Sequence, residues 1–527
     1  MSAETLRTPV VIVGGGTVGL ATAVFLAHHA VPSLVLERRA APSGHPRALG
    51  ISTRTLELFA EVGLRAELDA VAVRSAELRK ADARTVAEID RTGAPPAGPP
   101  AAAFAHSPER PSGHYPQDRL DAFLLPAARA RGARVEFGAE VTGIDQDGQG
   151  VSVTLADGRT VRADYLVGAD GVNSSVRTAL GVGTTGPGEI GRTTMNILFE
   201  ADLVGRFGSM PSMTEIQHPE APGMLLAVGE RRWVLHVVVP PGEDVLSDER
   251  CAAAVRTAIG VDDVPVRVLA ALPWRATVRL ADRFRVDRAF LVGDAARAIS
   301  PLGAFGLNTG LADAHNLAWK LAMVLAGQAG DPLLDSYHDE RRAVSELVTR
   351  QALLRWDTPR LHWDPSAVRE RAAAGAWNAP LVTTAYRYAS RAVVDPVADL
   401  PSTEDVGAAR DAAPGSLVPH RRLGDGPDDS TLYLNDSRFA LLTGPAGRGW
   451  EDAARAAGGA RGIDLRTVPL DAQTSSSMGL GPTDALLVRP DGFIAWRGGG
   501  AADPDLLERV VATVTGRGVP ARERSGG

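Results

Sequence analysis

The sequence predicts an α/β protein of three parts: a domain built on a parallel sheet, an antiparallel sheet domain inserted into it, and a C-terminal α/β domain. Two short apolar runs flank an alanine-rich helical pattern near the N-terminus, which is the pattern of a βαβ unit. Alternating strand patterns with few helical signals fill the middle of the chain. The length of 527 residues corresponds to roughly three domains of ~150 residues.

Composition excludes several functional classes. The formal net charge of -7 argues against a nucleic-acid surface. Cys251 is the only cysteine, so no intrachain disulfide or cysteine metal cluster can form, and we predict no metal site. The N-terminus lacks a basic signal region, and no run approaches the ~18 apolar residues that span a bilayer. We therefore expect a cytoplasmic protein that binds neither membrane nor nucleic acid.

The first predicted element is a nucleotide-binding turn between a strand and a helix. Val10–Val13 are four consecutive apolar residues, typical of a parallel strand buried on both faces. A helical pattern then runs over Thr17–His29. In a GxGxxG turn one glycine allows the tight bend, one lets backbone approach a pyrophosphate, and one lets helix and strand pack closely. The three glycines at this spacing are Gly14, Gly16 and Gly19.

An acid follows at the end of the second strand. Ser33–Leu36 is apolar and Glu37 stands where a carboxylate binds ribose hydroxyls in such sites. Strand, helix and acid in register predict a Rossmann-like dinucleotide site. In the following loop, Arg38, Arg39 and Arg47 could reach a phosphate or an adenine face, although a solvated basic loop is the alternative.

Two further strands are predicted to deliver carboxylates to the same edge of the sheet. Tyr165–Gly168 leads into Asp170, and Ala289–Val292 leads into Asp294. Ligands of open α/β folds bind at the carboxyl ends of the strands, so we expect both aspartates there. A carboxylate in that place can accept hydrogen bonds from a polyol.

The segment after Asp294 is predicted to be a stiff loop followed by a helix over Leu311–Leu325. Pro301 stiffens the loop, and Asn308 and Thr309 can cap the helix. The free N–H groups of a helix N-terminus stabilise negative charge, such as the charge that a flavin gains along its N1–C2=O edge on reduction. An ordinary strand, loop and helix is the alternative for this segment taken alone.

Antiparallel strands are predicted between residues 181 and 286. One of them, Arg231–Val239, places His236 on the same face as Val234 and Val238. His236 is a candidate pocket residue, and a solvated or core histidine is the alternative. Before this region, a helical pattern starts at Gln117, whose amide can bond a cofactor or cap the helix. The other expected strands here are Thr193–Glu200 and Gly223–Val228.

We expect four consecutive ranges along the chain. These are a first part of the nucleotide-binding domain (1–180, with a Pro/Ala-rich excursion near 75–110 toward the sheet domain), the sheet domain (181–285), a second part of the nucleotide-binding domain (286–400) and the C-terminal domain (401–527). Helix is expected over Tyr337–Trp356, and Arg517–Gly527 is expected to be a disordered tail.

Three spaced motifs, GGGTVG with Glu37, GADG around Asp170, and GDAA with SPLGAFGLN, strongly resemble those of single-component FAD-dependent aromatic hydroxylases, whose founding example is para-hydroxybenzoate hydroxylase. The resemblance covers about residues 1 to 400. The C-terminal part resembles the thioredoxin-like extension of phenol hydroxylases and of polyketide hydroxylases from antibiotic pathways, without the redox cysteine pair. The family usually reads GDAAH, and Arg297 stands here in place of the histidine, so local packing is expected to differ.

The resemblance implies roles for individual residues. Asp294 would bind the ribityl chain of FAD, the backbone of Gly306–Asn308 its pyrimidine edge, and Pro301 would lie beside the flavin C4a atom. Pro301, Arg47 and His236 are the candidate catalytic residues. The implied cofactor-binding residues are Gly14, Gly16, Thr17, Val18, Gly19, Glu37, Arg38, Arg47, Gln117, Asp170, Gly171, Gly293, Asp294, Pro301, Gly303, Gly306, Leu307 and Asn308.

The implied reaction is reduction of FAD by NADPH or NADH, formation of a C4a-hydroperoxide with O2, and transfer of one oxygen atom to a phenolic or polyketide ring inside a site that excludes water. Baeyer–Villiger insertion or inactivation of an antibiotic on the same scaffold are enzymatic alternatives. A protein that binds flavin or an aromatic ligand without turnover is the alternative from another class. A plain NAD dehydrogenase is disfavoured, because Asp294 and the SPLGAFGLN loop would have no role. The partner is a small aromatic molecule, and the sequence leaves open its identity and whether the chain forms a homodimer.

Overall fold

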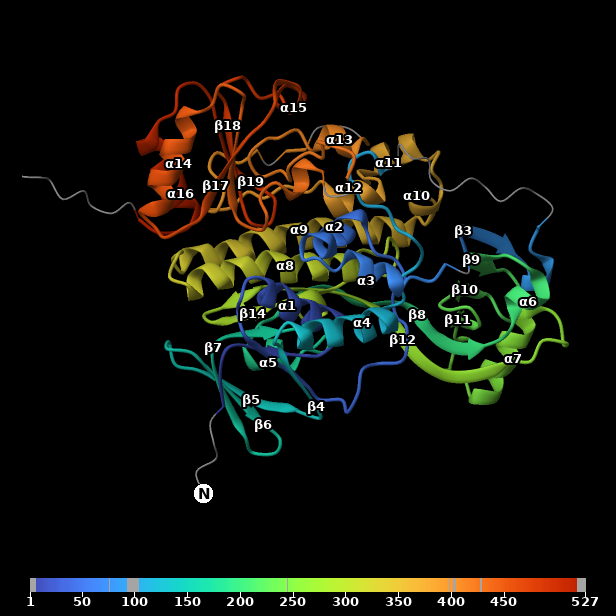
Figure 1. The fold of residues 1–527 in the computed structure, drawn as a ribbon. Helices are drawn as coiled ribbons and strands as arrows, with labels where there is room; N and C mark the ends of the chain where they lie inside the picture. Colours follow the sequence, from blue (N-terminus) through green and yellow to red (C-terminus); the bar gives the residue numbers. More distant parts are fainter. Residues whose placement is uncertain are drawn as a thin grey trace, which may run out of the picture.

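Three β-sheets organise the chain (Figure 1). Clusters of buried apolar side chains cover each sheet, and the third sheet contributes to two of them. The computed structural model describes residues 6–74, 76–91, 104–243, 245–397, 399–400, 404–426 and 429–518. Within these residues the sheets have eight, seven and four strands. The α/β fold class predicted from the sequence is confirmed, with a separate sheet domain and a C-terminal α/β domain.

The first sheet contains the predicted βαβ unit and is parallel through its centre. Its central order is β14-β7-β1-β2-β4, and every neighbouring pair in this order is parallel. The carboxyl ends of all five strands therefore lie along one edge. Antiparallel strands β13 (Arg285–Val286), β5 (Val141–Gln146) and β6 (Val151–Leu155) extend the sheet. The five parallel strands are β1 (Leu6–Val13), β2 (Ser33–Glu37), β4 (Arg134–Phe137), β7 (Thr160–Gly168) and β14 (Ala289–Leu291).

Helices cover the first sheet because its central strands are apolar on both sides. Val10, Val11 and Ile12 are fully buried, as expected for a parallel strand between two layers. Helix α1 (Thr17–His28) packs against both α4 (Gln117–Ala130) and α8 (Phe305–Leu325). Helix α9 (Pro332–Asp357) packs beside α8. The shorter helices α2 (Thr53–Glu61), α3 (Arg65–Ala70) and α5 (Ser175–Ala179) close the loops around the strand ends.

The second sheet has the order β15-β12-β8-β11-β10-β9-β3, and all pairs are antiparallel except β9 with β3. Trp233, Leu235 and Val237 point to one face, which packs on helix α7 (Asp248–Ile259). The strands are β3 (Ala76–Ala83), β8 (Thr184–Glu200), β9 (Met210–Ile216), β10 (Gly223–Ala227), β11 (Arg232–Val238), β12 (Arg267–Ala281) and β15 (Arg297–Ala298).

The sequence prediction was incomplete in this region. Helix α7 was missed, as were β9 and β12, and β8 is nine residues longer than the predicted strand. The polar start of β8 gives no apolar alternation, and it forms a strand because it pairs with β12 along nearly its whole length. Strand β3 lies in the predicted excursion and pairs with β9, whereas residues 92–103 of the excursion lie outside the described residues.

The C-terminal sheet has the order β17-β16-β18-β19 with only β16 and β17 parallel, which is a thioredoxin-like arrangement. Helices α14 (Gly449–Gly459) and α16 (Pro504–Val514) pack together on it. We retain the four ranges 1–180, 181–285, 286–400 and 401–527 as the proposed division of the chain into domains. Residues 519–527 of the predicted C-terminal tail lie outside the described residues. The strands are β16 (Phe439–Thr443), β17 (Leu465–Pro469), β18 (Ala485–Val488) and β19 (Ile494–Gly498).

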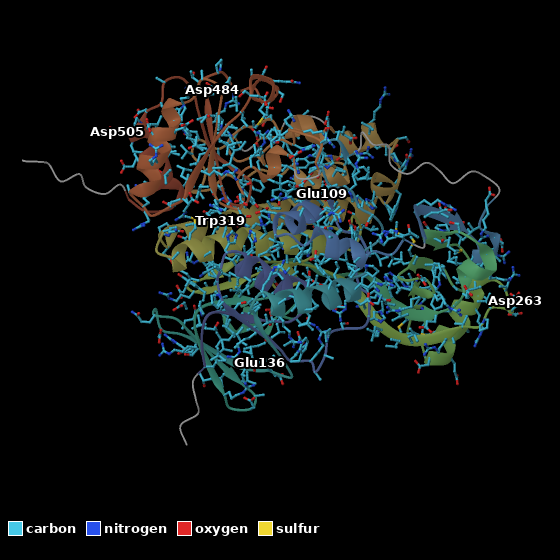
Figure 2. The ribbon with its side chains drawn as sticks, in the orientation of Figure 1. Glu109, Glu136, Asp263, Trp319, Asp484 and Asp505 are labelled. Carbon is cyan, nitrogen blue, oxygen red and sulfur yellow. The ribbon has the colours of Figure 1, made fainter. Side chains whose placement is uncertain are left out.

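The C-terminal domain lies on α8 and α9, on the side away from the first sheet (Figure 1). Trp319 of α8, labelled in Figure 2, packs edge-on against Phe439 of β16 with ring centroids 5.8 Å apart. Glu109, labelled in the same figure, accepts a hydrogen bond of 2.9 Å from the Tyr433 hydroxyl. Apolar and polar contacts together fix this domain on the rest of the chain.

A cluster of four buried charges reinforces this interface. Glu340 of α9 accepts hydrogen bonds from Lys320 of α8 at 2.8 Å and from the guanidinium of Arg489 at 2.5 and 2.9 Å. Arg489 also binds Asp491, and its guanidinium lies over the rings of Trp319. Two cations and two anions balance, which limits the cost of burying them. Desolvation still lowers the pKa of Lys320 to about 8.

None of the helices that the structure describes combines the length and the apolar character required to cross a bilayer.

Replacing Glu340 by Gln should destabilise the fold by about 3 kcal/mol, because it leaves Lys320 and Arg489 with one buried carboxylate between them. The measurement is the shift in the chemical denaturation curve. Glu346→Gln is the matched control on the same helix, since its ion pair with Arg342 is exposed and should contribute under ~1 kcal/mol. Equal effects of the two variants would contradict the importance of the buried cluster.

Candidate active site

The nucleotide turn lies between the end of β1 and the start of α1. A Cβ atom on Gly14 would lie 2.4 Å from the carbonyl oxygen of Ala169, and one on Gly19 would lie 1.9 Å from the carbonyl oxygen of Gly14. Side chains are therefore excluded at both positions. A Cβ atom on Gly16 would meet nothing within 4 Å, so this glycine faces open space.

The N-terminus of α1 is suited to an anion. Gly16 occupies the N-cap position and offers no side chain to the first N–H groups, and the first turn contains no acidic residue. These N–H groups and the helix dipole favour negative charge. A pyrophosphate fits such a site, because Gly16 lets it approach the backbone closely.

Val18 is the point at which three predicted motifs meet. Its side chain would lie 3.2 Å from a Cβ atom on Gly293 and 2.8 Å from one on Gly310. The glycine turn, the turn that carries Asp294 and the first turns of α8 are therefore in contact. Val18 is thus fixed by packing against protein on this side.

The carboxylate of Glu37 is buried at the end of β2 and already has partners. It accepts hydrogen bonds from the backbone N–H of Gly15 at 2.7 Å and from the backbone and side chain of Arg39 at 3.0 and 2.9 Å. Burial alone would raise the pKa of Glu37, but the hydrogen bonds from Arg39 and Gly15 lower it, so the group is ionised. Of the arginines predicted to reach a phosphate or an adenine face, Arg39 contacts Glu37, whereas Arg38 is exposed.

Asp121 of α4 is a buried acid that the sequence analysis missed. It accepts a short hydrogen bond from the Thr17 hydroxyl, which ties the start of α1 to α4. Desolvation raises the pKa of Asp121 to about 6. Gln117, one turn earlier, is half-buried and its backbone N–H donates to Ala48. The feature of the sequence that could have identified Asp121 is the presence of an acidic residue on the apolar face of a predicted helix.

Asp170 follows β7 at the predicted edge of the sheet, but its oxygens are occupied. They accept hydrogen bonds from the hydroxyls of Ser174 and Ser175, at 2.5 and 3.0 Å, and from the backbone N–H of Val176 at 3.0 Å. Asp170 therefore closes the loop that starts α5. Gly171 beside it is open, since a Cβ atom there would meet nothing within 4 Å.

Asp294 lies on the adjacent strand connection, in the turn after β14. Strands β7 and β14 are hydrogen-bonded neighbours, so both aspartates lie at the same edge of the sheet. Within the described part of the chain, no group donates a hydrogen bond to the carboxylate of Asp294, which is exposed. Desolvation by the surrounding protein nevertheless raises its pKa, and Arg297 and Arg47 act in the opposite direction. An exposed group that the protein desolvates lies in a recess, where a ligand can reach it.

Helix α8 starts at Phe305, six residues before the predicted start at Leu311. Its N-cap residue Ala304 has φ of 54°, a left-handed conformation that is uncommon for residues other than glycine. No side chain caps the helix, and its first turn contains no acidic residue. The preceding turn contains Gly303, with φ of 102°, and the exposed Pro301. The first N–H groups of α8 are thus available to a ligand.

The prediction that Asn308 and Thr309 cap this helix is wrong, because both lie within it. The side-chain oxygen of Asn308 accepts hydrogen bonds of 2.7 Å from the backbone N–H of Ser52 and from the hydroxyl of Thr55. Thr309 donates to the carbonyl oxygen of Phe305, one turn back, at 2.8 Å. Asn308 therefore holds the start of α2 against α8.

His236 of β11 lies on the face of the second sheet that meets the nucleotide-binding domain. Leu49 of that domain packs against apolar residues of this face. His236 is half-buried, contacts the ring of Trp274 with centroids 5.9 Å apart, and is in register with Asn196 of β8. Burial lowers the pKa of His236 to about 4, with His45 acting in the same direction, so the ring is neutral at pH 7.

Several polar atoms around His236 have no hydrogen-bond partner within the described residues. They are Oδ1 of Asn196, Nε1 of Trp274 and both ring nitrogens of His45, which lies near Asn196 without meeting hydrogen-bond geometry. Buried polar groups are normally satisfied, so these atoms suit a ligand that carries a few hydroxyl or carbonyl groups.

The distance between the two ends of the site requires an elongated ligand. Glu37 and Asp294 follow strands that are three positions apart in the order β14-β7-β1-β2, roughly 14 Å at the usual strand spacing. A dinucleotide that lies across the strand ends, with its pyrophosphate at α1, matches this distance. Arg47 is exposed in the loop before α2, and its charge acts on Asp121 and Asp294.

Comparison with known proteins gives matches over nearly the whole chain. The family described as FAD binding domain matches residues 7–352, and the family described as aromatic-ring hydroxylase, C-terminal, matches residues 411–518. The tetracenomycin A2 monooxygenase-dioxygenase of Streptomyces glaucescens is 38% identical over 97% of this chain and 98% of its own. The aklavinone 12-hydroxylase RdmE of Streptomyces purpurascens is 34% identical over 96% and 99%.

Solved structures also match this chain over nearly its whole length. The crystal structure of a ternary complex of aklavinone-11 hydroxylase with FAD and aklavinone superposes with a TM-score of 0.85, at 33% identity, over 98% of this chain and all of the other.

Asp121→Asn should stabilise the folded protein above pH 6 and have little effect at pH 4. A carboxyl whose pKa is about 6 when folded, against 3.8 ordinarily, opposes folding increasingly as the pH rises between these values, by up to about 3 kcal/mol. Chemical denaturation at pH 4.5 and pH 7.5 measures the difference. Asp118→Asn on the same helix is the control and should lose stability, because Asp118 pairs with Arg232 at 2.9 Å. A gain for Asp121→Asn that is the same at both pH values would refute the raised pKa.

Proposed function

Because the chain belongs to the family of FAD-binding aromatic-ring hydroxylases, we propose that it uses NADPH or NADH and O2 to hydroxylate a phenolic or polyketide ring. One oxygen atom of O2 is inserted into a C–H bond of the ring and forms a hydroxyl group. The two electrons from the nicotinamide reduce the other oxygen atom to water. Bound FAD supplies this chemistry by accepting the hydride and activating O2. The remaining steps of binding, orientation and exclusion of water belong to the residues of the chain.

We assign the adenosine end of FAD to the first βαβ unit. Glu37 is ionised, and its Oε2 atom, which accepts one hydrogen bond from Gly15, has a further lone pair with which to accept a ribose hydroxyl. The uncapped start of α1 and the open position at Gly16 suit the pyrophosphate. Arg47 would add positive charge there, whereas Arg38 is directed to solvent and Gln117 remains a candidate for a hydroxyl contact.

We assign the ribityl chain and the flavin ring to the edge between Asp294 and α8. The observation that carries the proposal is the exposed, desolvated carboxylate of Asp294 next to a helix start without any cap. A polyol is the natural partner of such a carboxylate. The N–H groups of Gly306 and Leu307 would bind the pyrimidine edge, where they stabilise the negative charge of the reduced ring. Pro301 would border the reacting side of the ring.

Asp170 is tied mainly into the loop that it closes. Its oxygens accept three hydrogen bonds, from Ser174, Ser175 and Val176, and Oδ1 keeps one lone pair with which it could accept a hydrogen bond from the cofactor. Gly171 is the residue of this loop that leaves room for a ligand. Hydride from NADPH or NADH would have to reach the exposed edge of the flavin, as the family implies.

We assign the aromatic substrate to the face of the second sheet around His236. The half-buried rings of His236 and Trp274 offer flat contact area, and the unpartnered atoms of Asn196 and His45 offer hydrogen bonds to ring hydroxyls or carbonyls. Because His236 is neutral at pH 7, its ring can accept a hydrogen bond from a phenol, and its lowered pKa makes it a weak base for removing the proton. The relatives named for tetracenomycin and aklavinone support a polyketide in this place.

The purified protein should be yellow with a flavin absorption spectrum, and should oxidise NADPH or NADH faster when an aromatic substrate is added. A panel of phenols, naphthoquinones and tetracyclic polyketides under 18O2 identifies the substrate by incorporation of one labelled atom. A colourless protein that ignores added FAD would refute the proposal. A lactone that opens on mild hydrolysis would indicate Baeyer–Villiger insertion instead of hydroxylation.

Asp294→Ala should weaken FAD binding at least about tenfold, the equivalent of one charge-assisted hydrogen bond lost. Asp164→Ala is the matched control, because Asp164 is an exposed aspartate on β7 that lies away from the carboxyl edge. Fluorescence titration of the apoprotein with FAD measures both affinities. Retention of wild-type affinity by Asp294→Ala would remove Asp294 from the cofactor site.

A further inference from the structure

A buried ionic cluster lies directly behind the start of α8. Asp313 of α8 pairs with Arg297 of β15 and with Arg341 of α9, and all three side chains have 0% exposure. Nε of Arg341 lies 2.7 Å from one carboxylate oxygen, and Arg297 binds the other. That second oxygen also accepts the backbone N–H of Gly293 at 3.1 Å. One carboxylate therefore holds two guanidinium groups and the turn that carries Asp294.

The two guanidinium groups also hold the backbone of the first turns of α8. Arg297 donates to the carbonyl oxygen of Gly306 at 3.2 Å, and Arg341 donates to that of Thr309 at 3.1 Å. The carbonyl of Gly306 and the N–H of Leu307 belong to one peptide group. A cationic donor at the carbonyl polarises this peptide, which makes the Leu307 N–H a stronger donor to a ligand.

The buried cluster contains two guanidinium groups and one carboxylate, and Asp294 on the ligand side is a further anion that faces Arg297. Desolvation holds the pKa of the neighbouring Tyr337 and Tyr388 well above the usual range, so both phenols are neutral. Arg341 donates to the Tyr388 hydroxyl at 3.0 Å and gains no negative charge from it. Salt screens the buried charge of Arg297 less than it screens a surface charge, and this charge adds to the positive end of the helix dipole.

We propose that Arg297 is a positioning residue that increases the preference of the site for reduced, anionic flavin over oxidised flavin. This inference rests on the proposed position of the flavin pyrimidine edge at the start of α8. In the family that this motif resembles, the position is usually histidine, which is charged only when it is protonated. Arginine is charged at every accessible pH, so this chain carries a permanent cation behind the flavin site.

Arg297→Gln keeps a hydrogen-bond donor near Gly306 and removes the charge. We expect the preference for reduced over oxidised FAD to fall about tenfold, which for a two-electron couple lowers the midpoint potential by ~30 mV. Arg297→Lys keeps the charge and should stay within about twofold of the wild type. Reductive titration of each holoenzyme against a reference dye measures the potentials.

Asp313→Asn should shift the potential in the opposite direction. It removes the single anion and leaves two cations, so the preference for reduced FAD should rise about tenfold. A purely structural role of the cluster would not produce shifts of opposite sign. Arg410→Gln is the control, because Arg410 is equally buried but donates to the carbonyl oxygens of His106 and Thr384 instead of to α8. The flavin midpoint potential of this variant should equal that of the wild type.

The outcomes separate this inference from the proposed function. A wild-type protein that binds no FAD refutes the proposed function. A yellow wild-type protein whose potential is unchanged in Arg297→Gln, or shifts in the same direction in both variants, refutes the role of Arg297 alone. If Arg297→Gln is insoluble, Arg297→Met replaces it, and the same fall in potential is expected because methionine carries no charge at any pH.

Discussion

The close approach of backbone segments at the carboxyl edge of the first sheet is the constraint on which the rest of the structure depends. The turn after β1, the loop after β7 and the turn after β14 are so near one another that Gly14, Gly19 and Gly310 have no room for side chains. Because these segments touch, the two helix starts that follow are held in fixed relative positions. A ligand that contacts both must lie across the strand ends.

Charge is buried in two places around α8 and α9, and the two places differ. The cluster of Glu340, Lys320, Arg489 and Asp491 is balanced and lies where the C-terminal domain meets α8 and α9. The cluster around Asp313 has two guanidinium groups and one buried carboxylate and lies next to the start of α8. The first cluster joins two domains, whereas the second lies where, in the proposed arrangement, it can act on a bound ligand.

In the proposed arrangement, cofactor and substrate contacts come from different sheets. The edge of the first sheet is built from backbone and a few carboxylates, which suit a dinucleotide, while the facing side of the second sheet presents rings and unpartnered polar atoms. Packing of Leu49 and the ion pair of Arg232 with Asp118 connect the second sheet to the nucleotide-binding domain. The rings around His236 can therefore vary with the substrate without disturbing the glycine turn.

The sequence alone determined the βαβ unit, the glycine turn and the two strand-end aspartates, because these features depend on local spacing and on apolar runs that form strands wherever they are buried. Only the tertiary structure decided how the polar groups are paired. Asp170 is engaged by its own loop and Asp294 is not, Arg39 and not Arg38 contacts Glu37, and Asn308 lies inside its helix. It also placed Asp121 against Thr17 and joined Arg297, Asp313 and Arg341. Some of these pairings, such as Asp121 with Thr17 and Asn308 with Thr55, join residues far apart in the chain. The local ones, such as Glu37 with Arg39, still depend on a burial that no local pattern encodes.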